Sequence, residues 1–413
     1  MKHTRIKALA AAMLLLTTMT GCGAGSGISL GHSAKAVELT AGMRSTGSES
    51  TKPDEAFLQG QTAFALSLMQ EAAKTREGRN VLLSPYSLMQ ALAMTANGAA
   101  GDTRAEMEQV LGGLPLDTLN SGLNYERQNA RKTVMKTANS IWYRDAEDFS
   151  VKNDFLKNAV GYYDAEIYKA PFDGTTLNDI NSWCNDKTDG MIPEILREIS
   201  GETVMYLFNA VSFDAKWKEP FEEPDTGVFT TAGGQQQNVM MMNSTESVFI
   251  GDERADGFLK PYKNGYSFAA ILPEQGLTPE AYLATQTPES LRGLLTGSAD
   301  AEVYIEMPQF RVTDGMELND TLKAMGMEKA FGAADFSEMT DIAVNISTVY
   351  QKTFIDVNAK GTKAAAVTEV AVDSCAPEQP PHSVILDRPF IYMIVDDETM
   401  LPVFTGILNA VND

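Results

Sequence analysis

Residues 207–221, LFNAVSFDAKWKEPF, give the clearest indication of the fold. This stretch begins inside an apolar segment, 204–213, whose β-branched and aromatic residues predict a buried strand. A charged corner follows, in which Trp217 stands between two lysines. A single strand cannot bury its own faces, so strands distant in sequence must supply its neighbours in shared sheets.

Further helices and strands alternate on both sides of this stretch. Apolar residues at helical spacing predict a helix over 56–73, and Ser84 and Pro85 open a second helix through residue 94 as cap and first-turn residue. The other predicted helices are 103–111, 151–159, 176–190 and 317–325. The other predicted strands are 134–143, 267–272, 301–307, 346–357, 391–395 and 402–408. There is no internal repeat and no second linker, so we expect one large mixed α+β domain over residues 55–413.

The first 21 residues resemble an export signal. A positively charged start precedes a short apolar run, 8–20, which is too short to span a bilayer. The run ends in Met-Thr-Gly-Cys at 19–22, which is similar to the cleavage box of bacterial lipoproteins, in which Cys22 would carry the lipid. The alternative is plain secretion with a chance cysteine. Residues 22–54 are rich in Gly, Ser, Thr and Ala, so we expect a flexible tether that holds an extracellular domain to a bacterial membrane through the lipid alone.

The bulk composition excludes several classes of function. The formal net charge is −22 and the basic residues form no cluster, so we expect no nucleic-acid partner. Of three histidines, only His382 lies in the predicted domain, in a Pro-rich stretch where a solvated turn residue is expected. A Ser-His-Asp or Cys-His unit thus has a single candidate, and no zinc or nucleotide motif is present. We expect no enzyme, no cofactor, no metal, and no disulfide among the three cysteines.

A second stretch, TKAAAVTEVAVDSC at 362–375, alternates with a period of two. The set that starts at Thr362 and takes every second residue is uncharged and small or β-branched throughout, and the other set holds every charge. One face could therefore be buried and the other solvated. A full predicted strand already precedes this stretch, and a Pro-rich segment follows. The stretch is either an ordinary hairpin partner or an exposed extended segment.

Six stretches resemble, in the same order, the signature segments of the serpin family. They are NVLLSPYSLMQALAM (80–94), INSWCNDKTDGMIPEIL (180–196), LFNAVSFDAKWKEPF (207–221), LKPYKNGYSFAAILP (259–273), YIEMPQFRV (304–312) and DRPFIYMIVDDETMLPVFTG (387–406). The resemblance covers about residues 55 to 413. It implies an α+β serpin fold with a large central mixed β-sheet, further sheets, about eight or nine helices and an exposed reactive loop.

In that family the reactive loop, here about 359–381, is displayed to a serine protease that attacks one of its bonds. The cut loop then inserts as a new middle strand of the main sheet, with the acylated protease held in a covalent 1:1 complex. The family's residue count puts the reactive bond at Cys375–Ala376, to within one to three residues. The hinge that enters first would be Gly361, Thr362, Ala364, Ala366 and Thr368. The sheet-opening region would be Ser84, Ser87, Asn209, Trp217 and Gln351, where Gln351 takes the place of a family histidine and can still hydrogen-bond.

The composition of the loop limits the target. No basic residue lies between Lys363 and Arg388, and no aromatic residue between Phe354 and Phe390. Trypsin-like and chymotrypsin-like pockets would find poor substrates here, whereas the small side chain of Cys375 suits elastase-like or subtilisin-like serine proteases. Val372 and Val370 are alternatives for that position, and cysteine proteases are an alternative target. The rival interpretation is a non-inhibitory serpin, a surface binding module whose hinge usually carries bulky or charged inward residues. We expect a monomer.

Overall fold

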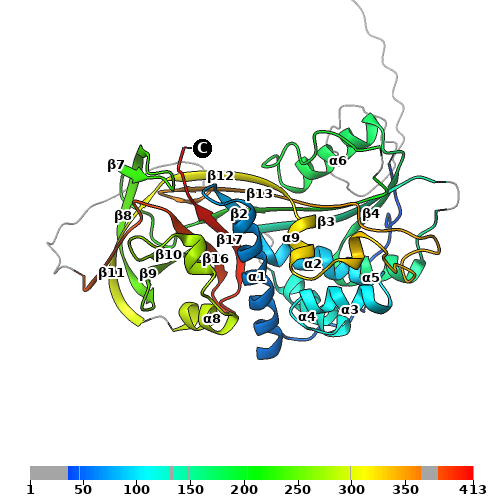
Figure 1. Cartoon of the computed structure of the whole chain (residues 1–413), viewed down its shortest axis with the longest axis horizontal. Helices are drawn as coiled ribbons and strands as arrows, with labels where there is room; N and C mark the ends of the chain where they lie inside the picture. The colour runs from blue at the N-terminus through cyan, green and yellow to red at the C-terminus, as the bar shows by residue number, and fades with distance from the viewer. Residues whose placement is uncertain are drawn as a thin grey trace, which may run out of the picture. The chain divides into compact units, whose positions relative to one another are not determined.

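The computed structural model describes residues 36–412 apart from 46, 131–133, 147–148, 202, 298 and 364–379. Its described part holds nine α-helices and two large sheets (Figure 1). The helices are α1 (Glu55–Thr75), α2 (Pro85–Ala96), α3 (Gly101–Val110), α4 (Leu116–Asn129), α5 (Asn153–Tyr163), α6 (Gly174–Lys187), α7 (Pro279–Leu283), α8 (Pro288–Thr296) and α9 (Asn319–Ala324). Local sequence explains the first two starts, since the side chains of Asp54 and Ser84 cap α1 and α2.

The first sheet is mixed. Its strands run in the order β1 (Val37–Glu38), β4 (Glu166–Ala170), β3 (Met135–Arg144), β5 (Met205–Phe213), β13 (Thr348–Asn358) and β12 (Phe310–Glu317). Two short strands, β14 (Gly361–Thr362) and β6 (Ala215–Lys216), continue it at one end of β13. The neighbours β5 and β13 are parallel, while β3 and β12 flank them antiparallel. The predicted strand at 204–213 is therefore β5, near the middle of this sheet.

The second sheet is almost wholly antiparallel. Its order is β15 (His382–Ile385), β11 (Ala299–Pro308), β8 (Gln236–Gly251), β9 (Ala255–Pro261), β10 (Tyr266–Pro273), β16 (Phe390–Asp396), β17 (Pro402–Leu408) and β2 (Val81–Leu83), with β7 (Asp225–Thr230) beside β8. The pair of β11 and β15 is the parallel exception. Apolar side chains from both sheets meet in one core that includes Trp217, Phe268 and Tyr392.

Helices cover the first sheet on both faces. On one face, α1 to α5 and α9 bury a large apolar core against β3, β5 and β13, and Figure 1 shows most of these helices on one side of the sheet. Helix α8 packs against α1 and β8 instead. On the other face, α6 packs Ile180 and Trp183 against Trp142, Tyr206 and Phe208. A sheet with both faces covered needs apolar strands, which explains why β5 is buried along its whole length.

The packed unit begins earlier than the sequence indicates. Residues 36–54 were expected to belong to the flexible tether, but Val37–Glu38 forms the edge strand β1 against β4. Ser45 Oγ donates to Gly161 O at 2.7 Å, and Thr51 N donates to Ser121 O at 3.1 Å. The tether boundary at residue 54 is therefore wrong, because the open edge of β4 offers backbone partners that no periodic pattern in the segment reveals.

Cys22, the predicted signal 1–21 and the tether up to residue 35 lie outside the described residues. None of the helices in the described ranges is both long and apolar enough to cross a bilayer.

Candidate functional site

The boundary between β5 and β13, here called the insertion seam, divides the first sheet in two. Seven residue pairs join these parallel strands, from Thr348 opposite Tyr206 to Phe354 opposite Ser212. If the chain that follows β13 turned back along it, that segment would run antiparallel to β13. It would then be antiparallel to β5 as well, because β5 and β13 are parallel. A middle strand between β5 and β13 would therefore require these seven pairs to separate.

Three amide side chains line up across the seam and form a row, here called the central ladder: Asn139, Asn209 and Gln351. Asn139 lies opposite Asn209, and Asn209 lies opposite Gln351, on three neighbouring strands. Asn209 Nδ2 donates to Asn139 Oδ1 at 2.7 Å, and Gln351 Nε2 donates to Asn209 Oδ1 at 2.6 Å. All three are buried, so separating β5 from β13 breaks a hydrogen bond that water does not compete for.

The start of α2 sits on this ladder. Ser84 N donates to Gln351 Oε1 at 2.8 Å, and Gln351 Nε2 also donates to Ser84 O at 3.0 Å. Asn209 Nδ2 donates to Ser87 Oγ, and both serines are fully buried. Four of the five predicted sheet-opening residues therefore form one network. The predicted ability of Gln351 to hydrogen-bond to its neighbours is confirmed.

The end of β13 and the short strand β14 form a narrow hairpin, here called the loop foot, residues 358–363. Thr362 lies opposite Val357 and Gly361 opposite Asn358 on β13, while the other edge of β14 pairs with β6. A Cβ atom on Gly361 would lie 2.1 Å from Ala215 O. Gly361, the first of the predicted hinge residues, is buried in the structure and makes room for a close approach of two backbones.

Trp217 belongs to the loop foot and not to the central ladder. Its ring stacks on Tyr262 with centroids 4.2 Å apart, and its Nε1 donates to Asn358 O at 2.8 Å. The hydroxyl groups of Tyr262 and Thr362 are hydrogen-bonded at 2.6 Å, and both side chains are buried. Burial raises the pKa of Tyr262, so this hydroxyl stays protonated. Trp217 therefore lies beside the loop foot, whereas Asn209 and Gln351 lie in the central ladder.

The family model for serpins, which are serine protease inhibitors, matches residues 59–411. The chain belongs to the serpin family. This serpin is 30% identical over 360 residues to an uncharacterized serpin-like protein of Thermococcus kodakarensis, with 83% of each chain covered. It is also 30% identical over 380 residues to Serpin-ZXA of Oryza sativa subsp. japonica, with 84% of this chain and 95% of that protein covered. Serpins are in general protease inhibitors and not catalysts.

Solved structures agree with this family. The native state of Tengpin, a thermophilic serpin, superimposes with a TM-score of 0.86 at 39% identity, over 91% of this chain and 100% of that one. The latent state of Tengpin gives a TM-score of 0.76 at 38% identity, over 88% and 100% of the two chains. The predicted serpin fold is confirmed, and the structure of this serpin is closer to the native than to the latent state of that relative.

Most predicted residues of the reactive loop lie outside the described residues: Ala364, Ala366, Thr368, Cys375 and Ala376. The loop returns at β15, which pairs with β11. His382 opens this strand, and its ring stacks on Phe249 with centroids 3.9 Å apart. It is therefore a half-buried strand residue and not the solvated turn histidine that the prolines indicated.

Two residues of the site were missed in the sequence. Asn139 is buried in β3, and nothing in its segment distinguishes it from a surface polar residue until the register places it beside Asn209. Tyr262 lies in a recognised family stretch, but its partner Thr362 is 100 residues away. Only strand pairing brings either residue to the site.

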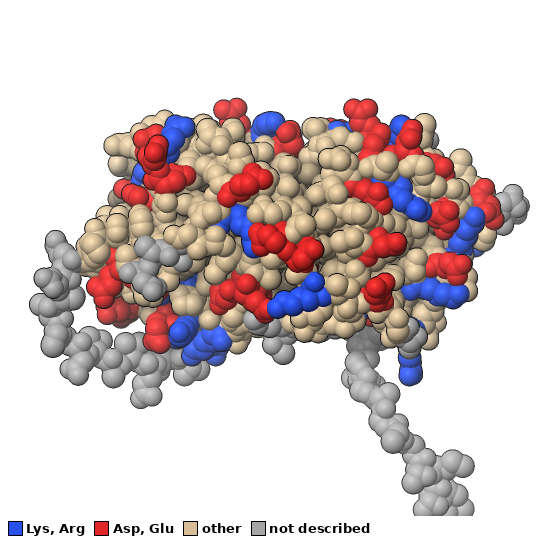
Figure 2. All heavy atoms as spheres, turned by 90° about the horizontal axis from the view of Figure 1, so that it is seen from below, with Lys and Arg blue, Asp and Glu red and all other residues tan. Residues whose placement is uncertain are grey.

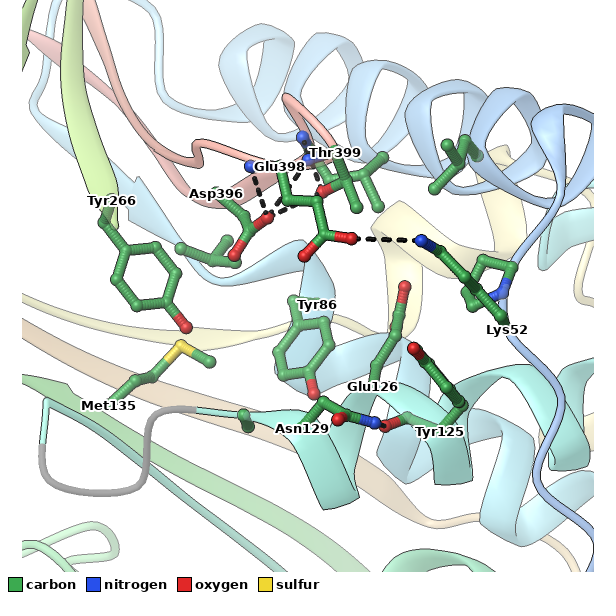
Figure 3. A pocket seen from close by; sticks show the side chains of 15 residues that line it. Lys52, Tyr86, Tyr125, Glu126, Asn129, Met135, Tyr266, Asp396, Glu398 and Thr399 are labelled. Atoms are coloured by element: carbon green, nitrogen blue, oxygen red, sulfur yellow. Dashed lines mark hydrogen bonds and ion pairs between the residues drawn. The ribbon is translucent and has the colours of Figure 1, made fainter. Parts of the chain in front are cut away.

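A pocket of this serpin with a volume of 230 Å³ lies apart from the loop foot and the ladder. Figure 3 shows Tyr86, Tyr266, Glu126 and Asp396 around it, with a Lys52–Glu398 hydrogen bond of 3.2 Å beside them. Burial raises the pKa of Glu126 to about 8, while a hydrogen bond donated by Gln61 opposes the rise. The pocket contains no residue of the predicted site.

Proposed function

We propose that this serpin is a suicide inhibitor of serine proteases, which it traps by loop cleavage, acylation and insertion of the loop at the insertion seam. The observation that carries the proposal is the loop foot, where Gly361 and Thr362 are already paired antiparallel to β13. Lys363 N extends this register with a hydrogen bond to Asp356 O at 2.6 Å. The first rungs of an inserted strand thus exist before any protease acts.

The register of the foot predicts where each hinge residue would go. Thr362 faces Val357, so each step forward along the loop is one step back along β13. Ala364 would then face Ile355, Ala366 would face Thr353, and Thr368 would face Gln351. These β13 residues are all buried. The small, uncharged set of the alternating stretch would therefore enter the core side of the sheet, and the charged set would stay on the other face.

At Lys363 the chain turns out of the sheet. Its φ of 56° lies in the left-handed region, which is unfavourable for a residue with a side chain. Insertion would return this residue to an extended conformation. It would also form new ladder hydrogen bonds, each contributing about 0.5–1.5 kcal/mol. These gains favour the inserted state over the exposed loop.

A change of hydrogen-bond partners at the central ladder supports the same proposal. Separating the seam removes the bond from Gln351 to Asn209, which leaves buried amide groups without a partner. In the predicted register, Thr368 arrives opposite Gln351 and brings a hydroxyl that can donate and accept. The cost of opening would then be recovered once the loop is in place. The fourteen residues 362–375 span roughly 46 Å when extended, about the length of a domain, so the acylated protease would be carried far from its docking position.

For the reactive bond we propose Cys375–Ala376, with elastase-like or subtilisin-like proteases as targets. The support is the loop composition, since the immediate neighbours Ser374 and Ala376 are small and uncharged and the loop has no basic or aromatic residue beyond Lys363. The test is to mix the purified serpin with pancreatic elastase and with a subtilisin, and to run denaturing gels. A band at the summed mass is expected with at least one of them. Each protease with its serine chemically blocked serves as the control and should give no band.

Plain cleavage of the loop by these and a wider panel of serine and cysteine proteases would overturn the proposal. It would favour the non-inhibitory binding module instead. Mass spectrometry of the released peptide locates the bond in either case, because a cut at Cys375–Ala376 gives a fragment that begins at Ala376.

We further propose that the chain is exported and anchored through a lipid on Cys22. The strongly acidic composition suits a protein that touches an anionic membrane only through its lipid. On the face shown in Figure 2, acidic side chains are spread widely with basic ones between them, and no basic patch is visible. Cys22→Ser should release the protein from the membrane fraction. Equal membrane retention of the variant and the parent chain would contradict the anchor.

A further inference from the structure

A lysine and a glutamate are buried together beneath the loop foot. Lys260 on β9 has 1% of its side chain exposed, and Glu246 on β8 has 9%. Lys260 Nζ lies 2.5 Å from Glu246 Oε1 and 3.3 Å from Ser244 Oγ. Ser244 Oγ in turn donates to Glu246 Oε1 at 2.7 Å. The two charges therefore neutralise each other, and one serine holds both in place.

The ammonium group of Lys260 also lies over two aromatic rings. Its Nζ is 4.1 Å from the centroid of Phe221 and 5.7 Å from that of Trp217. The two rings meet edge to face, with centroids 5.8 Å apart. Cation–π attraction is strongest where water is excluded, as it is here. Lys260 thus fixes the position of both rings from below.

The same two aromatic residues hold the turn of the loop foot. Phe221 N donates to Ala359 O at 2.9 Å, and Trp217 N donates to Lys360 O at 3.0 Å. With the bond from Trp217 Nε1 to Asn358 O, three successive carbonyl groups of the turn are bound by Trp217 and Phe221. The turn sets the register of β14 on β13, so an unbroken set of contacts runs from the ion pair to the first rungs of the inserted strand.

Stability does not explain why charges are buried at this point. Two charges lose their hydration when they are buried, and apolar pairs of similar volume are commonly as stable or more so. Burial lowers the pKa of Lys260, and Glu246 opposes this effect. What an apolar pair cannot supply is a cation fixed under Phe221 and Trp217.

We infer that Lys260, held by Glu246, is a positioning residue for loop insertion, which keeps the turn at 358–360 fixed while the cut loop begins to insert. The inference rests on the proposed trapping function. Without the cation the two rings can shift, the turn follows them, and the first rungs no longer stay in register. Insertion then starts later, and the protease hydrolyses its acyl bond and escapes more often.

Two variants separate positioning from folding. Lys260→Met leaves the carboxylate of Glu246 buried without its counter-ion, with only the hydrogen bond from Ser244. The double variant Lys260→Met with Glu246→Leu has no buried charge and should melt close to the parent chain. For both variants, about three to ten times more inhibitor molecules should be used up for each protease trapped. The rate of the initial cleavage of the loop should not change. The control is Arg76→Met, which breaks a partly buried ion pair, Arg76–Asp314 at 3.2 Å, that does not touch the foot. It should lower the melting temperature but leave the consumption unchanged.

A second measurement keeps the inference independent of the target protease. The loop of each chain is cut by a protease that it does not trap, and the rise in thermal stability of the cut chain is followed in time. This rise should be slower in both variants than in the parent chain. If the parent chain traps no protease, the proposed function is wrong, and the rate of this rise alone then tests whether Lys260 positions the turn. If the double variant matches the parent chain in both consumption and rate, the inference is wrong.

Discussion

The insertion seam and the loop foot both bury polar groups against β13, but they bury different kinds of group. At the seam, the side chains of Asn209 and Gln351 are hydrogen-bonded to each other and to the start of α2. At the foot, backbone carbonyls and the single hydroxyl of Thr362 are held by aromatic residues. In the proposed mechanism the seam bonds must break, whereas the foot bonds must last. The amide side chains at the seam can change hydrogen-bond partners when β5 and β13 separate. The turn at the foot, by contrast, keeps the register of β14 on β13 because its carbonyl groups stay bound.

The largest expected effect concerns the hinge beyond the foot. Ala364→Arg would carry a charge toward the buried Ile355 of β13, where it would be unpaired at a cost of several kcal/mol. It should convert the serpin from an inhibitor into a substrate with an unchanged melting temperature. Gel assays with the trapped protease measure this directly.

The matched control is Ala365→Arg, one residue further and on the opposite face of the predicted strand. It should still trap protease. Equal behaviour of the two variants would refute the register. Thr362→Arg is a poorer test, because Thr362 is already buried in the native sheet and its replacement would disturb the fold itself.

At the seam itself, Gln351→Leu should weaken the closed state. It leaves Asn209 Oδ1 and Ser84 N buried without this partner, at a cost of about 1–3 kcal/mol. The variant should lose trapping activity faster than the parent chain during incubation at a mildly raised temperature. Thr353→Val is the control, because Thr353 is on the same face of β13 but donates to Leu82 O instead of bonding to β5. Equal rates of loss in Gln351→Leu and the parent chain would show that the ladder does not hold the seam.

At the foot, Gly361→Ala should lower the stability of the native state. The added methyl group would meet Ala215 O at 2.1 Å, so the backbone must move, at a cost of roughly 1–3 kcal/mol. Calorimetry should show a lower melting temperature. Gly174→Ala, with open space around its Cβ position, is the control and should melt near the parent value. Two equal melting temperatures would contradict the close approach of Gly361 to Ala215.

The last prediction lies outside both regions, at Glu126, and concerns the pH dependence of stability and not trapping. Its pKa is raised from the ordinary 4.5 to about 8 by burial, so the folded chain keeps a proton that the unfolded chain loses. This stabilising contribution is complete below pH 4.5 and declines as the pH rises to about 8. Glu126→Gln should therefore flatten the fall of the melting temperature between pH 5 and 8. Parallel curves for the variant and the parent chain would contradict the raised pKa.

Local sequence patterns predicted the elements of the fold better than their contacts. Helical spacing from Ala56 to Ala73 and the Ser84-Pro85 start matched α1 and α2 closely, because capping and amphipathic periodicity are local properties. The polar helix α4, and the sixteen-residue strand β8 with its mixed pattern, gave no clear period and were missed. The secondary structure of such segments depends on packing against neighbouring elements, which a short stretch of sequence does not reveal.

For the candidate site, too, some residues could be predicted from the sequence and others could not. Alternation from Thr362 onward indicated a strand with one small face, and the family resemblance supplied Asn209, Gln351 and both serines. Strand pairing could not be predicted from the sequence, so Asn139 was missed, the position of Trp217 beside the loop foot was not predicted, and neither was the burial of Lys260. Burial of a lysine becomes apparent only when its partner glutamate, fourteen residues away, is placed beside it.

The most direct test is to lock the seam. Ala210 on β5 lies opposite Lys352 on β13 and opposite Ala138 on β3. A disulfide between cysteines at 210 and 352 should leave the loop cleavable but abolish trapping until it is reduced, whereas one between 138 and 210 should leave trapping intact, because β3 and β5 are expected to move together. A covalent protease complex formed while the 210–352 disulfide is intact would contradict insertion between β5 and β13.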